Sequence, residues 1–271
     1  MDRRLTPAND RAALESLRGV IAAPRYVPGD AARLAVPMAD LCRIPGGARD
    51  RQLLLGAAVT VIDRHMGWAF VQNGTDGYCG YLPETALGEP RAPTHRVSAA
   101  ATHLSADARV QARDIASLSF GAEVTVTGST EIFAETPDGF IPSPHLRPLD
   151  NPFDDPVTVA RLFLGTPYLW GGNSRAGIDC SGLVQTALLA CGHACPADSD
   201  LQRGLGTGLP PGTRFRRNDL LFWEGHVALV ADDAQIIHAS GHVMATVLEK
   251  TDAAIARIDA TGNPVIAHRR L

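Results

Sequence analysis

Three residues in the second half of the chain have the types and spacing needed for thiol-based nucleophilic catalysis. Cys180 follows Asp179 at the start of an apolar helical pattern, where unpaired backbone N–H groups favour a thiolate and are expected to lower the thiol pKa. His226 and His238 lie on successive predicted strands, and a hairpin centred on Asp232 would set them directly opposite each other. One imidazole can then act as base while the other fixes its tautomer and orientation.

Each of these residues also has a purely structural interpretation. A buried cysteine that packs under the sheet is an equal alternative for Cys180 taken alone. A single strand histidine is more often a core or rim residue than a catalytic one. Two histidines in register, with a cysteine at a helix start in the same domain, are much harder to assign to packing. The pattern therefore favours a Cys–His–His catalytic group.

Two predicted helices and a predicted hairpin position this group. The first helix begins with Asp155 as N-cap and Pro156 in its first turn, and Gly165 ends it. On one face of this helix recur Val157, Ala160, Arg161 and Leu164. The second helix begins at Cys180, ends before Gly192, and has as its apolar face Cys180, Val184, Ala187 or Leu188, and Cys191. Strands are predicted over 219–223, 226–230 and 235–240, which gives an α+β domain.

Composition places the chain among globular proteins of more than one domain. Its 271 residues are 45% hydrophobic and 20% charged, which argues against disorder. The net charge of -4 argues against a surface that binds nucleic acid or an anionic membrane. Five irregularly spaced cysteines fit reduced thiols better than a disulfide framework. No segment has the pattern of a secretory leader or a membrane span, so a cytoplasmic location is expected.

An internal repeat occupies the first 150 residues. The segment 53–61 returns as 118–126, and 80–83 returns as 139–142. Both copies show short alternating patterns punctuated by Gly, Asp and Pro, typical of a small β-barrel of about 60 residues. Two barrels are therefore expected, over 31–90 and 91–150. An extension over 1–30 would pack on them, and the catalytic domain would occupy 151–271.

Several sequence blocks are shared with known families. The segment 76–81 reads DGYCGY and resembles the ending of bacterial SH3-like modules, which 138–140 repeats more weakly. Further along, the chain reads PYLWGG, GIDCSGLV, DLLFW, GHVALV and IHA, in that order between 167 and 239. These blocks resemble the NlpC-type cell-wall cysteine peptidases. With two SH3-like modules in front, the chain resembles the γ-D-glutamyl-L-diamino-acid endopeptidases, also called dipeptidyl-peptidase VI, of that family.

The resemblance implies a fold, a reaction and roles for the catalytic residues. The fold would be papain-like α+β, and the reaction would be hydrolysis of murein stem peptides that frees L-Ala-γ-D-Glu from the diamino acid. Cys180 would be the nucleophile, His226 the general base and His238 its orienting partner. Tyr168 would place its phenol near the oxyanion side of the cleft.

The resemblance also implies a binding site for the free amine of the N-terminal L-Ala. Asp179 and Ser181 would face this amine, and a carboxylate beside an ammonium is a sensible lock for an unblocked terminus. Asp50 and Tyr78 would complete the pocket from the SH3-like side. Asp50 is shorter than the glutamate expected there, and Ala197 stands where many relatives carry arginine.

Other features give weaker signals. Cys191, His193 and Cys195 do not have the spacing of a structural zinc site, so no metal and no cofactor are expected. The remaining seven histidines, His65, His95, His103, His145, His193, His242 and His268, are predicted to lie on the surface or in loops. A monomer that binds a stem peptide, and neither nucleic acid nor membrane, is expected.

Alternative functions remain open at this point. A secreted wall-remodelling endopeptidase would share the catalytic group. A noncatalytic wall-binding protein could use the SH3-like pair alone, although an intact Cys–His–His set argues against it. An acyltransferase on the same scaffold would let an amine or alcohol intercept the thioester in place of water.

Overall fold

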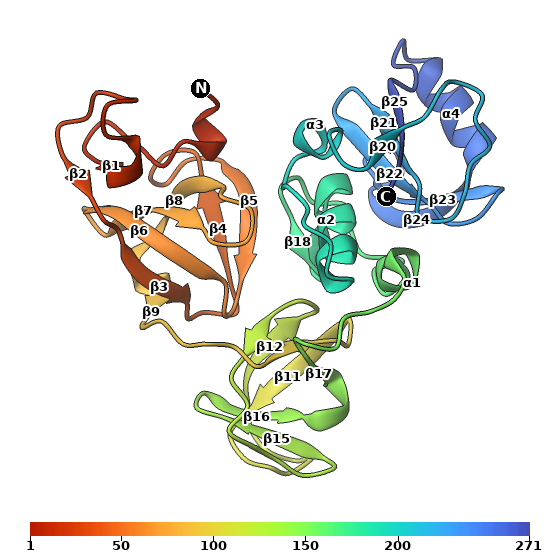
Figure 1. The fold of residues 1–271 in the computed structure, drawn as a ribbon. Helices are drawn as coiled ribbons and strands as arrows, with labels where there is room; N and C mark the ends of the chain where they lie inside the picture. The colour runs from red at the N-terminus through yellow and green to blue at the C-terminus, as the bar shows by residue number, and fades with distance from the viewer. The chain divides into compact units, whose positions relative to one another are not determined.

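The computed structural model describes all residues, Met1–Leu271, as two compact units. Unit 1 is Met1–Asp150 and unit 2 is Asn151–Leu271. Figure 1 colours the first from red to yellow-green and the second from green to blue. Unit 1 contains strands and short 3-10 turns and no α-helix, whereas unit 2 combines four α-helices with a six-stranded sheet. None of the helices has the length and apolar character that a bilayer-spanning segment requires.

Residues 1–29 form an extension that is anchored to the module following it. Its elements are η1 Arg3–Leu5, β1 Ala13–Leu14, η2 Glu15–Leu17 and β2 Tyr26–Val27. Asp63 of that module is only 4% exposed and accepts a hydrogen bond from Asn9. The same carboxylate forms ion pairs with Arg11 and Arg25. Ala12 enters the apolar core beside it, so polar and apolar contacts together fix the extension.

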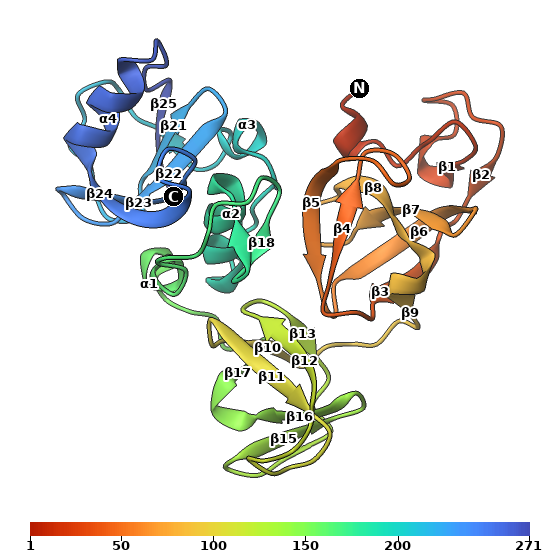
Figure 2. The same ribbon diagram turned by 180° about the vertical axis from the view of Figure 1, so that it is seen from behind.

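Seven antiparallel strands form the first module (Figure 2). They are β3 Asp30–Leu34, β4 Met38–Cys42, β5 Arg49–Leu54, β6 Ala58–His65, β7 Trp68–Asn73, β8 Cys79–Pro83 and, after η3 Glu84–Ala86, β9 Leu87–Gly88. Their order is β5-β4-β8-β7-β6-β3-β9. The expected closed barrel is not found, because closure needs the two edge strands to pair and β5 and β9 do not pair with each other.

The second copy of the repeat has an equivalent strand order. Its elements are β10 His95–Val97, β11 Ala101–Ser105, β12 Asp114–Ser119, β13 Glu123–Val124, β14 Gly128–Ser129, β15 Phe133–Thr136, β16 Gly139–Pro142, η4 Ser143–His145 and β17 Leu146–Pro148. The orders are β12-β11-β16-β15-β14 and β13-β10-β17. They follow the order of the first module, with the counterpart of β6 broken into β13 and β14. This break divides one sheet into two.

The repeated sequence segments form the same turns in both copies. Gly56 follows β5 with φ +86°, and Gly121 follows β12 with φ +88°, a backbone conformation that favours glycine. A Cβ atom at Gly56 would lie 2.2 Å from the carbonyl oxygen of Glu123, so a larger residue does not fit. After β8 and β16, a 3-10 turn leads to a short strand in each copy. The repeat therefore encodes a structural unit.

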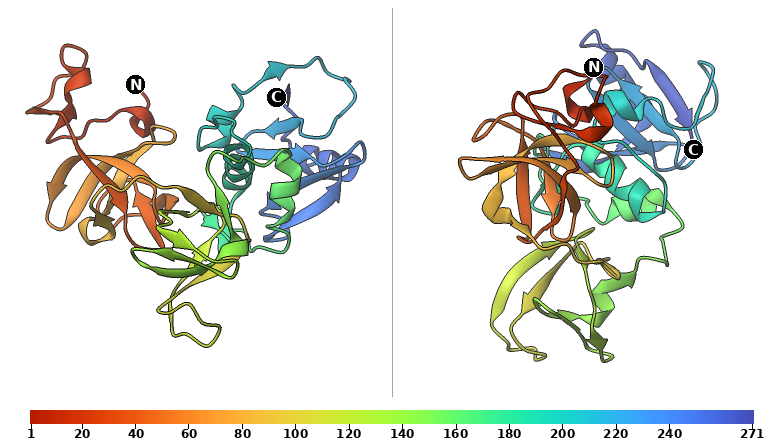
Figure 3. Two further views of the ribbon diagram at one scale, coloured as in Figure 1. Left: turned by 60° about the horizontal axis from the view of Figure 1, so that its bottom comes forward. Right: turned by 60° about the vertical axis from the view of Figure 1, so that its left-hand side comes forward.

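Unit 2 is built on one antiparallel sheet, seen from two further sides in Figure 3. Its strand order is β20-β25-β21-β22-β23-β24. The sheet strands are β20 Thr207–Gly208, β21 Leu220–Trp223, β22 His226–Val230, β23 Gln235–Ser240, β24 Ala245–Lys250 and β25 Ala267–Arg270. The helices are α1 Pro156–Arg161, α2 Cys180–Ala190, α3 Ser199–Gln202 and α4 Thr251–Asp259, and the small strands β18 Asn173–Ser174 and β19 Gly177–Ile178 precede α2.

Helices α1 and α2 begin as the sequence predicts. Asp155 caps α1 by accepting the N–H of Thr158 at 3.0 Å. Helix α2 ends at Ala190, and Gly192 follows with φ +79°. Of the four residues predicted to share one face of α1, Val157 and Ala160 are buried, whereas Arg161 and Leu164 are exposed. The helix stops at Arg161, so Leu164 lies beyond its last turn, and the side chains that it buries are Pro156, Val157, Val159 and Ala160.

The central strands of unit 2 are buried along nearly their whole length. Leu221, Trp223 and Ala228 pack in one cluster with Ala254 of α4, while α2 contacts β22 and β23. Strands that bury consecutive residues need cover on both faces, and the helices supply it. This layering is the α+β arrangement expected for the domain.

Strands β24 and β25 and helix α4 were not predicted. Strand β25 brings His268 against Asp219, with 2.7 Å between imidazole Nε2 and carboxylate. Arg270 binds the same carboxylate through two nitrogens, each at 2.7 Å. Asp219 is 1% exposed and His268 is 9% exposed, so the expectation of a surface position for His268 is wrong. A buried carboxylate needs such partners, and here they tie the last strand to β21.

Candidate active site

Cys180 is the first residue of α2 and is 5% exposed. The preceding Asp179 caps the helix, since one carboxylate oxygen accepts the N–H of Gly182 at 2.7 Å. The other oxygen accepts the N–H of Gly171 at 2.8 Å. The Cys180 sulfur lies 4.0 Å from the carbonyl oxygen of Gly225, in the turn that leads into β22. Helix start, cap and turn together fix the thiol beside the first residues of β22.

The electrostatic setting of this thiol differs from the expectation. Burial raises the pKa of Cys180 to about 12, and the negative charge of Asp179 adds to the rise. Backbone N–H groups of Val227, Ser181 and Cys180 itself act in the opposite direction. Their effect is the one predicted for a helix start, but burial outweighs it. The expected lowering of the thiol pKa is therefore wrong, and the thiol keeps its proton at neutral pH.

The predicted contact between His226 and His238 forms. Nε2 of His226 lies 2.9 Å from Nδ1 of His238, and the two rings meet edge to face. His238 is 1% exposed, whereas His226 is partly exposed. The first imidazole therefore has one nitrogen committed to the second and one left for other chemistry.

The register that brings these rings together is not the one predicted. Leu229 pairs with Ile237, which moves the centre of the hairpin by one residue and shifts the pairing by two. His226 and His238 are thus diagonal neighbours rather than directly opposed residues. A shift of two keeps both side chains on one face, and a diagonal pair is still within reach of aromatic rings. The reason for the shift is the length of the connection: five residues, 231–235, separate the last paired residues Val230 and Ile236, whereas a hairpin centred on Asp232 would leave only three, 231–233.

His226 is neutral at physiological pH. Burial lowers its pKa to about 3, and the positive charges available on His238 and Arg257 contribute in the same direction. Burial also lowers the pKa of His238. A neutral imidazole can accept a proton, as a general base must. With a protonated thiol nearby, the site is arranged for proton transfer during attack rather than for a preformed ion pair.

Two further residues extend the group and were missed in the sequence. Glu249, on β24, lies 3.1 Å from Nε2 of His238. Arg257, on α4, donates to both carboxylate oxygens of Glu249, at 3.1 and 2.7 Å. The only sequence signal was an acidic residue at the end of an alternating segment, 245–250, next to the predicted hairpin. Without the strand pairing, in which Glu249 lies opposite Ile236, nothing linked it to His238.

Tyr168 lies close to the thiol. Its backbone N–H donates to the carbonyl of Met244 at 2.9 Å, and its ring packs about 3.9 Å from the position of a Cβ atom built on Gly241. Burial raises the pKa of its phenol, and the charges of Cys180 and Asp179 raise it further. The phenol is thus a protonated donor beside Cys180.

Asp179 and Ser181 are engaged with each other. The Ser181 hydroxyl donates to Asp179 at 3.0 Å, in addition to the two backbone N–H groups already described. Burial raises the pKa of Asp179 in spite of these three hydrogen bonds. The structure therefore gives Asp179 a role as helix cap, and amine recognition by Asp179 and Ser181 stays a prediction.

Asp50 and Tyr78 lie in unit 1. Asp50 is held bidentately by Arg3, with distances of 2.7 and 3.1 Å between guanidinium nitrogens and carboxylate oxygens. Tyr78 is 2% exposed, and the guanidinium carbon of Arg51 lies 5.4 Å from its ring centroid. Arg51 in turn pairs with Asp76 in a buried ion pair. The recognition roles of Asp50 and Tyr78 stay predictions.

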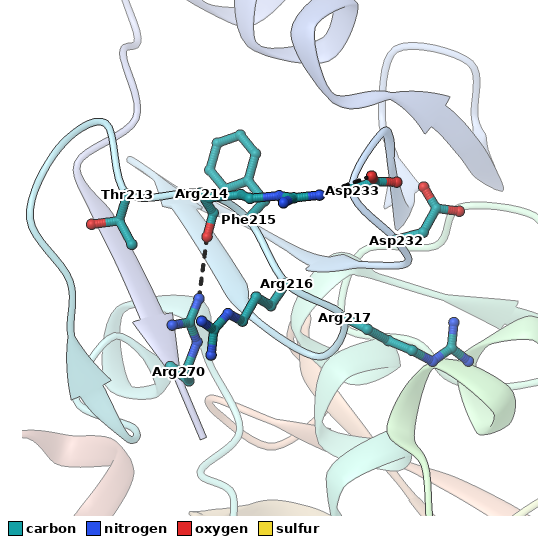
Figure 4. Close-up of a pocket in the computed structure, with 8 residues that line it drawn as sticks. All are labelled: Thr213, Arg214, Phe215, Arg216, Arg217, Asp232, Asp233 and Arg270. Atoms are coloured by element: carbon teal, nitrogen blue, oxygen red, sulfur yellow. Dashed lines mark hydrogen bonds and ion pairs between the residues drawn. The ribbon is translucent and has the colours of Figure 1, made fainter.

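A separate hollow of unit 2 contains none of the predicted site residues. It has a volume of about 460 Å³, and most of its lining residues lie just before β21 or just after β22 (Figure 4). Its lining residues are Thr213, Arg214, Phe215, Arg216, Arg217, Asp232, Asp233 and Arg270. His226 is at the opposite end of β22. No group of three or more His, Cys, Asp and Glu side chains in the structure is arranged to hold a metal ion.

Comparison with known families identifies two parts of the chain. Residues 41–87 match the bacterial dipeptidyl-peptidase Sh3 domain, and residues 165–256 match the NlpC/P60 family. The second match includes Cys180, His226 and His238. The chain contains an NlpC/P60 domain. Its papain-like fold and the SH3-type domain before it confirm the family resemblance and the coarse fold predicted from the sequence.

Individual relatives match about a third of the chain and, in one case, most of it. Dipeptidyl-peptidase 6 of Lysinibacillus sphaericus is 40% identical over 84 residues, 31% of this chain and 31% of that protein. The γ-D-glutamyl-L-lysine dipeptidyl-peptidase of Bacillus cereus is 27% identical over 224 residues, 70% of this chain and 67% of that protein. The chain thus matches about a third of the length of the first relative. Both relatives are named as peptidases.

A solved structure shows the same fold. The crystal structure of an NlpC/P60 family protein from Bacillus cereus has a TM-score of 0.76 and 21% sequence identity. The similarity covers 89% of this chain and 99% of that one.

Proposed function

We propose that the protein is a cysteine peptidase that hydrolyses the γ-D-glutamyl bond to the diamino acid in murein stem peptides with a free N-terminal L-Ala. The observation that carries the proposal is the group formed by Cys180 at the start of α2 and the hydrogen-bonded pair His226–His238, 2.9 Å apart. The product would be L-Ala-γ-D-Glu. The names of the relatives, dipeptidyl-peptidase 6 and γ-D-glutamyl-L-lysine dipeptidyl-peptidase, support this substrate class.

The reaction follows from the protonation states of the site. The Cys180 sulfur attacks the amide carbonyl carbon while His226 takes the thiol proton. The amide C–N bond then breaks, and the leaving amine of the diamino acid receives that proton from His226. Water, activated by the same imidazole, hydrolyses the thioester and releases L-Ala-γ-D-Glu. The phenol of Tyr168 would donate to the oxyanion that forms at each tetrahedral stage.

The proposal also covers organisation and cellular role. The strand order shared by the two copies of the repeat supports a second SH3-like module over 91–150, after a first over 31–90 and the extension 1–30. The peptidase domain would be 151–271. We propose a monomeric enzyme that recycles murein peptides in the cytoplasm. The free amine of the N-terminal L-Ala would be recognised by Asp179, Ser181, Asp50 and Tyr78.

A secreted wall-remodelling endopeptidase is the second candidate. It is favoured by the similarity to the peptidoglycan endopeptidase RipB of Mycobacterium tuberculosis, 35% identical over 95 residues, 29% of this chain and 39% of that protein. Polymeric peptidoglycan blocks the L-Ala amine through its amide to the muramic acid lactyl group. The two candidates therefore differ in whether a blocked terminus is accepted.

The deciding experiment uses matched free and blocked substrates. The protein is incubated with L-Ala-γ-D-Glu linked to meso-diaminopimelate or to L-lysine, with the N-acetylated forms of both, and with intact sacculi. Mass spectrometry follows L-Ala-γ-D-Glu, and Cys180→Ala is the negative control. Release from the free peptides alone supports the recycling peptidase. Equal cleavage of free and acetylated peptides, or efficient digestion of sacculi, supports the second candidate, and no hydrolysis of any substrate contradicts both.

A further inference from the structure

The hydrogen-bonded group in unit 2 does not end at His238. It continues through Glu249 on β24 to Arg257 on α4, with 3.1 Å from imidazole to carboxylate and 2.7 Å from carboxylate to guanidinium. Glu249 is pinned at both oxygens by Arg257, since the second guanidinium contact is 3.1 Å. Four residues from three strands and one helix are thus joined in one line, beginning at His226.

The direction of each hydrogen bond in this line follows from the groups at its end. A guanidinium only donates, so Glu249 accepts from Arg257, and a carboxylate only accepts, so the hydrogen between Glu249 and His238 must be on Nε2 of His238. Nδ1 of a neutral His238 then carries a lone pair and must accept from Nε2 of His226. A neutral His226 that has its hydrogen on Nε2 has a bare Nδ1.

We propose that Glu249, held by Arg257, is a positioning residue that fixes the tautomers of both imidazoles and makes Nδ1 of His226 the atom that takes the Cys180 proton. The inference rests on the proposed function, because it assigns a proton acceptor in that reaction. The sulfur lies 4.0 Å from the carbonyl oxygen of Gly225, directly before His226 in the chain. The Glu249 carboxylate, two hydrogen bonds away from His226, therefore determines which imidazole nitrogen of His226 can accept the proton.

The charges at the end of the line also act on the reaction. When Cys180 gives its proton to Nδ1, His226 becomes an imidazolium whose Nε2–H remains donated to His238. The negative charge of Glu249 favours this cation, and the positive charge of Arg257 opposes it. Glu249 and Arg257 act on both imidazoles, and His238 also acts on His226. Replacing Glu249 or Arg257 should thus shift the imidazole pKa in opposite directions.

The first test does not depend on catalysis. Histidine is labelled with ¹⁵N in the full chain carrying Cys180→Ala, and ring nitrogen shifts are assigned near neutral pH. Both His226 and His238 should show hydrogen on Nε2 and a bare Nδ1. With Arg257→Met added, the hydrogens should remain on Nε2 of both rings. With Glu249→Leu added, which removes the acceptor for His238, each ring should instead show a mixture of the two tautomers. Hydrogen on Nδ1 of either ring in the parent overturns the inference, whatever the peptidase assay gives.

The second test separates a positioning role from simple loss of a salt bridge. Glu249→Gln and Arg257→Met both break the ion pair, but they should move the acid limb, the fall of kcat/KM on the acid side of its pH profile, in opposite directions. Glu249→Gln should move it by about 0.5 to 1 pH unit to lower pH, and Arg257→Met by a similar amount to higher pH. Glu249→Gln should also lower kcat more than it changes KM. Arg257→Lys, which keeps the charge, should restore the position of the limb.

A matched control excludes a general effect of removing an arginine. Arg217 also pairs with a carboxylate, that of Asp155, but it lies in the hollow of Figure 4, just before the start of β21. Arg217→Met should leave the acid limb in place. Shifts in the same direction for Glu249→Gln and Arg257→Met, or no shift in either, would overturn the inference. A chain that cleaves none of the stem peptides yet shows the expected tautomers would refute the proposed function and leave the tautomer assignment intact.

Discussion

Arg3 binds both carboxylate oxygens of Asp50, at 2.7 and 3.1 Å, so the acidic group predicted to receive an ammonium already has a cationic partner. The contact raises the pKa of Arg3. The turn η1 holds Arg3 in place, because Asp2 caps it by accepting the N–H of Arg4 at 2.9 Å. A substrate ammonium that uses Asp50 would have to compete with this guanidinium.

Opposite effects on substrate affinity are expected from the two partners of this ion pair. Arg3→Met removes the competing cation and should lower KM for the free stem peptide. Asp50→Asn removes a charged contact worth about 1.5 to 3 kcal/mol and should lower kcat/KM by roughly ten- to a hundredfold. Steady-state kinetics with free peptide measure both, and Arg4→Met, which leaves Asp50 paired, is the control. Unchanged KM in Arg3→Met and Asp50→Asn alike would remove Asp50 from amine recognition.

The three residues of the catalytic group should lose activity in a fixed order. Cys180→Ala and His226→Ala remove the nucleophile and the base, and each should lower kcat by more than about 1,000-fold. His238→Ala should cost less, because an orienting group does not itself transfer the proton. Initial rates of L-Ala-γ-D-Glu release give the order, with thermal unfolding as the check on folding. An active Cys180→Ala, or equal retention of activity in both histidine variants, would contradict the assignment.

Local signals in the sequence were enough for the elements that hold Cys180. Asp155 and Asp179 are side-chain caps, and Gly192 ends α2, because caps depend on residues within one turn. The repeat was also visible, because the turns at Gly56 and Gly121 both have a positive φ angle that favours glycine, so the same residue recurs in both copies. Caps and turns of this kind can be predicted because they depend on only a few adjacent residues.

Properties that depend on distant segments were not predictable in the same way. The register of His226 against His238 was wrong by two because it follows from a loop length that the pattern left open. Glu249 came to His238 only through the pairing of β23 with β24. The direction of the Cys180 pKa was wrong because the helix start is visible in the sequence and the degree of burial is not.

The chemical reactivity of Cys180 should report a protonated thiol. Its pKa is raised to about 12 and that of His226 is lowered to about 3, so the neutral pair persists across the physiological range. Alkylation by iodoacetamide should be slow at pH 7 and should rise as the pH approaches the thiol pKa. Peptide hydrolysis should instead stay level through neutrality, because His226 removes the proton during attack, and should fall only as the pH approaches the His226 pKa of about 3. Fast alkylation that is constant from pH 5 to 8 would show a thiolate–imidazolium pair at rest.

Stability should fall in acid for the same reason. The folded-state pKa of His226 is lowered from the ordinary value of 6.5 to about 3, so the unfolded chain binds the proton first as the pH falls. The contribution is fully present above pH 6.5 and is lost between pH 6.5 and 3, at about 1.4 kcal/mol per pH unit for one proton. Urea unfolding of wild type and His226→Gln between pH 7 and 4 tests this. The variant should show a shallower decline, the exposed His242→Gln should not, and parallel curves for all three would refute the account.

The last prediction concerns Tyr168. Burial and the charges of Cys180 and Asp179 raise the pKa of its phenol, so the O–H remains a donor at every pH at which the enzyme would work. A donor aimed at the developing oxyanion acts mainly in the transition state, and losing one typically lowers kcat by roughly 100- to 1,000-fold with little change in KM. Tyr168→Phe should show this split, because it removes only the hydroxyl and keeps the ring contact near Gly241.

A purely packing role for Tyr168 gives a different result. Tyr168→Phe would then have near wild-type kcat, and Tyr168→Leu, which also removes the ring, would lower the melting temperature as well as the activity. The comparison of the two variants therefore separates the hydroxyl from the ring. Tyr168→Phe with unchanged kcat would exclude the phenol as an oxyanion donor, and the backbone N–H groups at the start of α2 would be left as the donors to test.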